Sequence, residues 1–68
     1  MINTTALRGL IIASGQTQRD FARKMGVSEA TFYNKMKRGK FDSDEMSYMI
    51  KELGIADPVR IFFAELVP

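Results

Sequence analysis

The side chains best suited to chemistry in this sequence form a run of cations just past its middle. Four cations fall within six residues: Lys35, Lys37, Arg38 and Lys40. Such a cluster suits a polyanionic partner, because neutralised phosphates supply most of the non-specific affinity for nucleic acid. Lysine and arginine also favour helix C-termini, so a purely structural role is the alternative. Just before the cluster lies Asn34, whose amide can form two hydrogen bonds to adenine N6 and N7.

The sequence lacks the residue types on which most catalytic and metal sites depend. It has no cysteine and no histidine, which removes thiolate ligands, the commonest general base and the commonest metal ligand. Asp42, Asp44 and Glu45 can in principle hold Mg²⁺, but aspartates at a helix start are expected as caps. We therefore expect a protein that is not an enzyme, with no metal, no cofactor and no small-molecule ligand.

Charge is divided unevenly along the chain. Residues 1–41 carry eight basic and two acidic side chains, a net charge of +6, whereas residues 42–68 carry two basic and six acidic ones, a net charge of −4. The first part would attract a polyanion and the second would repel it. Surface charge placed by chance is the alternative.

Length and composition indicate one small globular domain spanning residues 1–68. The chain has 68 residues, of which 46% are hydrophobic and 26% are charged. Its apolar runs are far shorter than the roughly 20 residues that span a bilayer, and its N-terminus lacks the pattern of a signal peptide. We expect a cytoplasmic protein with no membrane partner.

Apolar residues recur at helical spacing along the whole chain, and helix-capping residues lie at each boundary. Val, Ile and Phe favour strands, so a short strand is an alternative near the end of the chain. The dipeptide Asp57-Pro58 is a helix-start signal and favours a helix there. The sequence therefore predicts an all-α bundle of five short helices, at about 5–14, 18–25, 28–37, from Asp42 or Ser43 to 53, and 58–67.

Gly26 interrupts a helical pattern, which makes it either a tolerated defect in one long helix or a turn between two short ones. N-cap residues on both sides, Thr17 and Ser28, favour two helices, and glycine accepts the positive φ of a tight turn. Phe32 is expected to pack back on the first of them. Two short helices joined by such a turn form a helix-turn-helix, here at about 18–37. An αα-hairpin with no DNA role is the alternative.

The stretch TQRDFARKMGVSEATFYNKMKRG resembles the helix-turn-helix of the Cro and phage-repressor family. The segments FYNKMKRGKF and DPVRIFFAE resemble, more narrowly, small Cro-like regulators of Gram-positive prophages. The resemblance covers nearly the whole chain and implies a lambda-repressor-like DNA-binding domain. One departure is Lys35, because many members have an apolar residue nine positions after the turn glycine. Met36 is apolar instead, which predicts a recognition helix rotated by about one residue.

Helical intervals assign an outward face to residues 28–37, with Phe32 and Met36 turned to the core. In a helix-turn-helix this face and the first turn enter the major groove. The predicted base-reading residues are Ser28, Glu29, Ala30, Thr31 and Asn34. As alternatives, Glu29 complements the helix dipole and Asn34 is simply solvated.

Contacts to the DNA backbone are expected on both sides of that face. The resemblance supplies Gln18, because the matching glutamine of the family touches the DNA backbone. Packing against the fourth helix is the alternative for Tyr33. The predicted backbone contacts are Thr17, Gln18, Arg19, Tyr33, Lys35, Lys37, Arg38 and Lys40.

The last expected helix is more apolar than one short helix can bury. Phe62 and Phe63 point about 100° apart on a helix, so we expect one in the core with Val59 and Leu66 and the other free for a partner. We predict a two-fold homodimer, at least on DNA, whose interface contains Ile61, Phe62, Phe63 and Leu66. As the alternative, both phenylalanines cap the monomer core.

These features predict a sequence-specific transcriptional regulator of double-stranded DNA, a Cro-like phage or prophage repressor that places helix 28–37 in the major groove of an operator. The alternative is a helix-turn-helix that binds protein, such as an antirepressor or antitoxin. The acidic fourth helix and Glu29 at a base-reading position suit that alternative. Binding to DNA discriminates the two functions.

Overall fold

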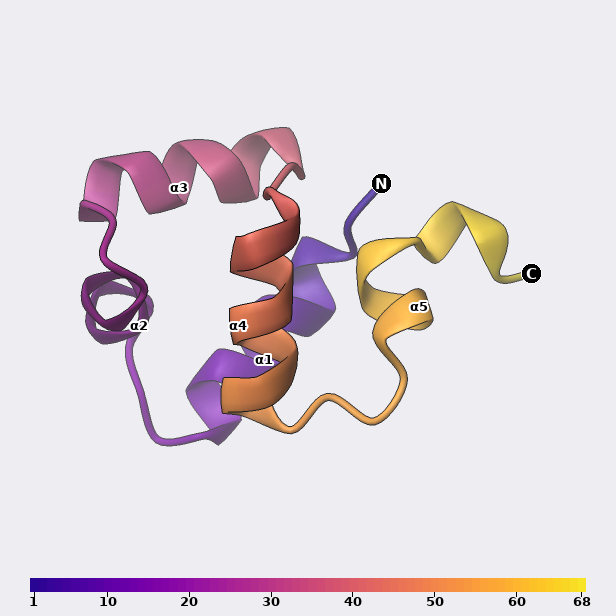
Figure 1. The fold of residues 1–68 in the computed structure, drawn as a ribbon, viewed down its shortest axis with the longest axis horizontal. Helices are drawn as coiled ribbons and strands as arrows, with labels where there is room; N and C mark the ends of the chain where they lie inside the picture. The colour runs from indigo at the N-terminus through magenta and orange to yellow at the C-terminus, as the bar shows by residue number, and fades with distance from the viewer.

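Each α-helix begins at a residue whose side chain accepts a hydrogen bond from the backbone N–H three residues further on. These N-caps are Asn3, Thr17, Ser28, Asp42 and Asp57. The computed structural model describes residues 1–68 and confirms the all-α prediction of five helices, with no strand (Figure 1). The helices are α1 (Thr4–Ala13), α2 (Gln18–Met25), α3 (Glu29–Arg38), α4 (Ser43–Leu53) and α5 (Pro58–Phe62), followed by a 3-10 turn, η1 (Ala64–Leu66).

The helix-turn-helix is formed by α2 and α3, and Gly26 is the turn between them. Gly26 adopts a left-handed conformation with φ +82° and ψ 21°, which a residue with a Cβ adopts only at a cost. The N–H of Val27 then donates to the carbonyl of Ala22 across the turn, at 3.1 Å. The prediction of two short helices is confirmed, and the alternative of one long helix is wrong.

A line of aromatic rings joins the helices of this motif to the rest of the core. The rings of Phe21 and Phe32 lie 6.1 Å apart in an edge-to-face arrangement. Phe21 also contacts Tyr48 of α4, and Phe32 contacts Phe41 of the loop before α4, each with ring centroids 5.8 Å apart. The buried core consists of Ile2, Leu7, Ile11, Phe21, Ala22, Phe32, Met36, Phe41, Met49 and Phe62.

The C-terminal segment differs from the single helix predicted over residues 58–67. The carbonyl of Ile61 accepts a hydrogen bond from the N–H of Asn3, at 2.7 Å, and the backbone of Phe63 leaves the helical conformation, with φ −133° and ψ 51°. α5 therefore ends at Phe62, and η1 follows. Phe62 is 3% exposed, but Val59 and Leu66, which were expected to accompany it into the core, are 47% and 70% exposed. That part of the prediction was wrong.

The arrangement leaves α3 on the outside of the molecule. In Figure 1, α3 runs across the top, α2 is seen end-on below its N-terminal end, and α4 runs down the centre in front of α1. α5 and η1 lie on the right, near the N-terminus, where the terminal ammonium group of Met1 is paired with Glu65. No helix combines the length and apolar character needed to cross a bilayer.

Candidate nucleic-acid interface

The outer face of α3 is polar and exposed, because its two buried residues lie on the opposite side. Phe32 and Met36 are the only buried residues of this helix, and they share a stripe at i and i+4. The burial of Met36 bears out the expectation that the apolar stripe includes this position rather than Lys35. All the predicted base-reading residues are exposed: Ser28, Glu29, Ala30, Thr31 and Asn34.

Two of these residues also hold the start of α3 in shape. The hydroxyl of Ser28 accepts from the N–H of Thr31 at 3.1 Å and donates to the hydroxyl of Thr31 at 2.9 Å. In this cap the Ser28 hydroxyl both donates and accepts a hydrogen bond within the helix start. Thr31 keeps its methyl group and its own hydroxyl proton for a ligand. Ser28 is therefore placed mainly to shape the helix start, and the free polar groups of this face are those of Glu29, Thr31 and Asn34.

A hollow of about 450 Å³ lies where the C-terminal end of α1 meets the starts of α2 and α3. It brings together predicted DNA-backbone contacts from the start of α2 and from α3. The α3 contact is Tyr33, which is 48% exposed. The side-chain oxygens of Gln16 and Gln18 are buried there without a hydrogen-bond partner. The hollow is lined by Ile12, Gln16, Thr17, Gln18, Arg19, Glu29 and Tyr33.

The N-terminus of α2 opens beside this hollow. Thr17 and Asp20 form a capping box, in which the N–H of Asp20 donates to the Thr17 hydroxyl at 3.0 Å and the N–H of Thr17 reaches the Asp20 carboxylate at 3.5 Å. The bonds from Thr17, side chain first and backbone second, lower the pKa of Asp20 below its ordinary value of 3.8. The box leaves the N–H groups of Gln18 and Arg19 unpaired, and such groups at a helix start favour an anion.

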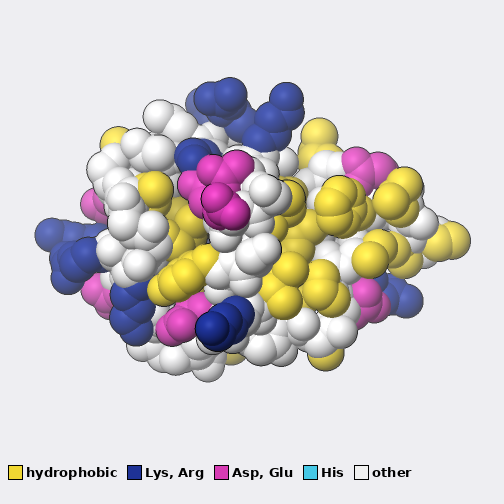
Figure 2. All heavy atoms as spheres, in the orientation of Figure 1, with side chains coloured by type: hydrophobic (Ala, Val, Ile, Leu, Met, Phe, Trp, Pro, Cys, Tyr) yellow, Lys and Arg dark blue, Asp and Glu magenta, His cyan; other side chains and the backbone are white.

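Most of the basic cluster lies exposed at the other end of α3. Figure 2 shows basic side chains gathered above α3. Lys37, Arg38 and Lys40 are all exposed. Lys35 is placed differently, because its ammonium group is paired with the carboxylate of Glu45 on α4. Lys35 is therefore engaged within the protein, unlike the three exposed cations.

The acidic residues that were considered for Mg²⁺ serve the start of α4. Asp42 and Glu45 form a second capping box, each accepting from the other's backbone N–H. Asp44 is exposed in the same first turn. The expected capping role is confirmed for Asp42, and Glu45 completes the box.

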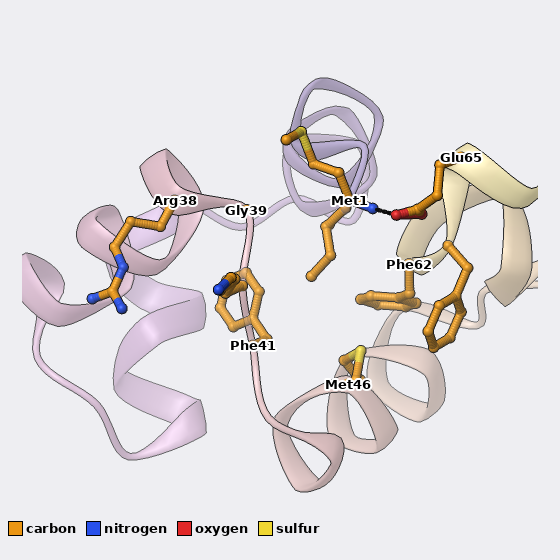
Figure 3. Close-up of a pocket in the computed structure, with 10 residues that line it drawn as sticks. Met1, Arg38, Gly39, Phe41, Met46, Phe62 and Glu65 are labelled. Atoms are coloured by element: carbon orange, nitrogen blue, oxygen red, sulfur yellow. Dashed lines mark hydrogen bonds and ion pairs between the residues drawn. The ribbon is translucent and has the colours of Figure 1, made fainter.

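An apolar surface lies around α5 and η1, at the right of Figure 2. Phe63 is 47% exposed and Leu66 is 70% exposed, whereas the predicted interface residue Phe62 is buried and serves the monomer core. Ile61 is partly buried against the same core. Beside this surface is a groove of about 460 Å³, into which Met1, Phe41 and Phe62 converge (Figure 3).

Sequence reasoning missed three residues near these sites. Gln16 and Ile12 line the hollow at the start of α2, and the position of Gln16 just before the N-cap Thr17 was the available signal. Glu45 was considered only with the carboxylates that could hold Mg²⁺, although it pairs with Lys35. Ten positions separate the members of this pair on two different helices, and no local pattern points to it.

A family model of the bacteriophage CI repressor helix-turn-helix domain matches residues 6–56. The matched region contains most of α1 and all of α2, α3 and α4, and it ends before α5. No curated protein and no solved structure shows a significant match.

Proposed function

We propose, from the premise that the chain belongs to the family of bacteriophage CI repressor helix-turn-helix domains, that it represses transcription by reading an operator with α3 in the major groove. Membership in this family makes it a DNA-binding regulator of the repressor type. We further propose that it is Cro-like, that it binds a specific operator and that it acts in the cytoplasm of a phage or prophage host.

The observation that carries the proposal is the exposed polar face of α3 between two sets of phosphate-binding groups. Asn34 stands on this face, turned away from Phe32 and Met36 in the core. An exposed amide at this place can read adenine, and the exposed Glu29 can accept a hydrogen bond from cytosine N4. Contacts to phosphates on both sides would fix the register of the helix on the duplex.

The two flanks suit phosphates in different ways. At the start of α2, the free N–H groups of Gln18 and Arg19 and the Arg19 guanidinium can hold a phosphate. Past the end of α3, the exposed Lys37, Arg38 and Lys40 supply charge without fixed geometry. Affinity for any duplex should therefore fall with salt, while the sequence preference depends on the face between the flanks.

Selection of duplexes from a random-sequence library by the wild-type protein tests this function. The selected duplex and a scrambled duplex of the same composition are then compared by fluorescence anisotropy at low and moderate salt. We expect a preference for the selected duplex of about 10³-fold or more. If no duplex binds even at low salt, the helix-turn-helix serves a protein partner instead.

We also propose that the protein binds its operator as a homodimer through the surface formed by Val59, Phe63 and Leu66. These residues are 47%, 47% and 70% exposed, and they adjoin Ile61 and the buried Phe62. Exposed apolar side chains gathered on one side of a small protein, as at the right of Figure 2, mark interaction surfaces. A two-fold dimer would double the base contacts of so small a domain, and its operator would contain two inverted half-sites.

Analytical ultracentrifugation of the protein with and without the selected duplex tests the dimer. Phe63→Ser combined with Leu66→Ser should give one protomer per duplex and weaken operator binding. Ile12→Ser is the control for the number of protomers alone, because Ile12 is an exposed apolar residue outside this surface but lines the hollow at the start of α2. Two protomers on the duplex in the double variant would contradict the proposed interface.

A further inference from the structure

Lys35 connects the recognition helix to α4 through an ion pair. Its ammonium group contacts Oε2 of Glu45, and the two side chains are 29% and 12% exposed. The pair is therefore shielded from water far more than the neighbouring cations of the basic cluster. The carbonyl of Lys35 also accepts from the N–H of Lys40, at 3.1 Å, so the residue is bound at both its backbone and its side chain.

The carboxylate of Glu45 is held from its other side by the cap of α4. Oε1 of Glu45 accepts from the N–H of Asp42 at 2.9 Å, while the N–H of Glu45 donates to the Asp42 carboxylate at 2.7 Å. Glu45 thus has one oxygen fixed to the helix start and the other on Lys35. An acceptor fixed in this way gives Lys35 a rigid anchor on α4 rather than a mobile surface partner.

The position of Lys35 on the helix indicates what this anchor controls. At about 100° per residue, Lys35 lies about 100° from Asn34 and about 140° from Ala30, on the flank of α3 that also carries Thr31, about 40° away. The two buried residues, Phe32 and Met36, lie only about 40° apart around the helix. They form a line of contact about which α3 can roll, and Lys35 holds the helix on one flank of that line.

We propose that Lys35 and Glu45 are positioning residues that set the roll of α3 and thereby its sequence discrimination, and that Lys35 is not a phosphate contact. A helix with its side chains is about 10–12 Å wide, so a roll of about 20° moves the outer side chains by about 2 Å. Functional groups must be held within about 0.5 Å of their productive geometry. Loss of the ion pair therefore weakens base reading and leaves phosphate binding intact. This inference rests on the proposed DNA-binding function.

Four variants separate this role from a phosphate contact. Glu45→Gln removes the charge and keeps the cap, because glutamine serves equally at this position of a capping box. Lys35→Met removes the other charge, the double variant removes both, and Lys35→Arg is the conservative control that keeps the pair. Circular dichroism identifies a temperature at which every variant is folded, and Glu45→Gln carries the test if Lys35→Met does not fold.

Anisotropy with the selected and scrambled duplexes over a range of salt gives the DNA readout. We expect Glu45→Gln and Lys35→Met each to lose about tenfold in discrimination between the two duplexes, and the double variant to lose no more than either alone. The slope of affinity against salt should stay at the wild-type value in all of them, and Lys35→Arg should behave as wild type. A phosphate contact would instead give Lys35→Met a slope smaller by about 0.9 and equal losses on both duplexes, with Glu45→Gln unaffected; that result overturns the proposal.

Residual dipolar couplings of the free protein test the positioning without DNA. In Glu45→Gln, the couplings measured along α3 should still fit the geometry of an α-helix. They should no longer fit the orientation that α3 has relative to α1 and α4 in the wild type. Unchanged couplings would overturn the proposal even if no preferred duplex exists. Absence of a preferred duplex with altered couplings would instead contradict the DNA-reading function and leave the positioning role supported.

Discussion

Phe21 on α2 and Phe32 on α3 meet edge to face, with their ring planes at 69° to each other. Both side chains are fully buried. They face each other across the turn at Gly26, so this contact fixes how the two helices of the DNA-binding motif cross. A change in either ring is expected to disturb both the stability of the domain and the placement of α3.

Phe32→Leu should lower the free energy of unfolding by about 1–2 kcal/mol, because it removes ring contacts from the core. Tyr33→Leu is the matched control, since Tyr33 is the next residue and is exposed; its effect should stay within about 0.5 kcal/mol. Denaturation in urea measures both. A larger loss for Tyr33→Leu than for Phe32→Leu would contradict the orientation of α3.

Gly26→Ala should destabilise the protein by about 1–2 kcal/mol, because φ is +82° there and a Cβ disfavours that conformation. No atom lies within 4 Å of the added Cβ, so the loss reflects the backbone alone. Gly9→Ala is the control, in the interior of α1 with similarly open space, and should stabilise by about 0.5–1 kcal/mol. Thermal unfolding of the two variants should therefore shift in opposite directions, and shifts of the same sign would count against the turn.

The capping carboxylate of Asp20 should make the stability of α2 depend on pH in the acid range. Its pKa is lowered in the folded state, chiefly by the bonds from Thr17, so its stabilisation is complete above the unfolded value near 3.8 and is lost as pH falls through the lower folded value.

The melting temperature of Asp20→Asn should therefore lie below that of the wild type near neutral pH and approach it as the pH falls below the unfolded value near 3.8. Asp44→Asn is a control, because Asp44 is exposed in the first turn of α4 and makes no capping bond. A difference for Asp20→Asn that does not change with pH would contradict the role of its charge.

The cations past the end of α3 should contribute affinity without sequence preference. Lys37→Ala and Arg38→Ala should each reduce the slope of log affinity against log salt by about 0.9, and each should weaken selected and scrambled duplexes alike. Lys51→Ala is the charge-matched control, because Lys51 is exposed in the last turn of α4. An equal effect of all three substitutions would show that only net charge matters.

The helix starts were predictable from the sequence because each depends on a contact only three residues long. Thr17, Ser28 and Asp42 cap their helices within the local segment, and no distant residue is needed to recognise them. Gly26 was recognisable for the same reason, since caps on both sides of it leave only a turn.

The end of α5 was not predictable in this way. It coincides with a hydrogen bond from Asn3 to Ile61, which come from opposite ends of the chain. The pairing of Lys35 with Glu45 is also tertiary, so the sequence showed a cation in a basic cluster rather than a contact between helices. The exposed face of α3 was predictable because Phe32 and Met36 define its buried side by helical periodicity alone.

Asn34→Ala tests the central claim most directly, because this residue stands on the reading face of α3 without serving the core. The account predicts that the ratio of affinities for the selected and scrambled duplexes falls by about 5- to 150-fold, while the salt slope and the affinity for the scrambled duplex stay unchanged. Ser47→Ala, at an exposed polar position of α4, should leave the ratio unaltered. A ratio that survives Asn34→Ala, or an equal loss on both duplexes, would contradict the reading of DNA by this face.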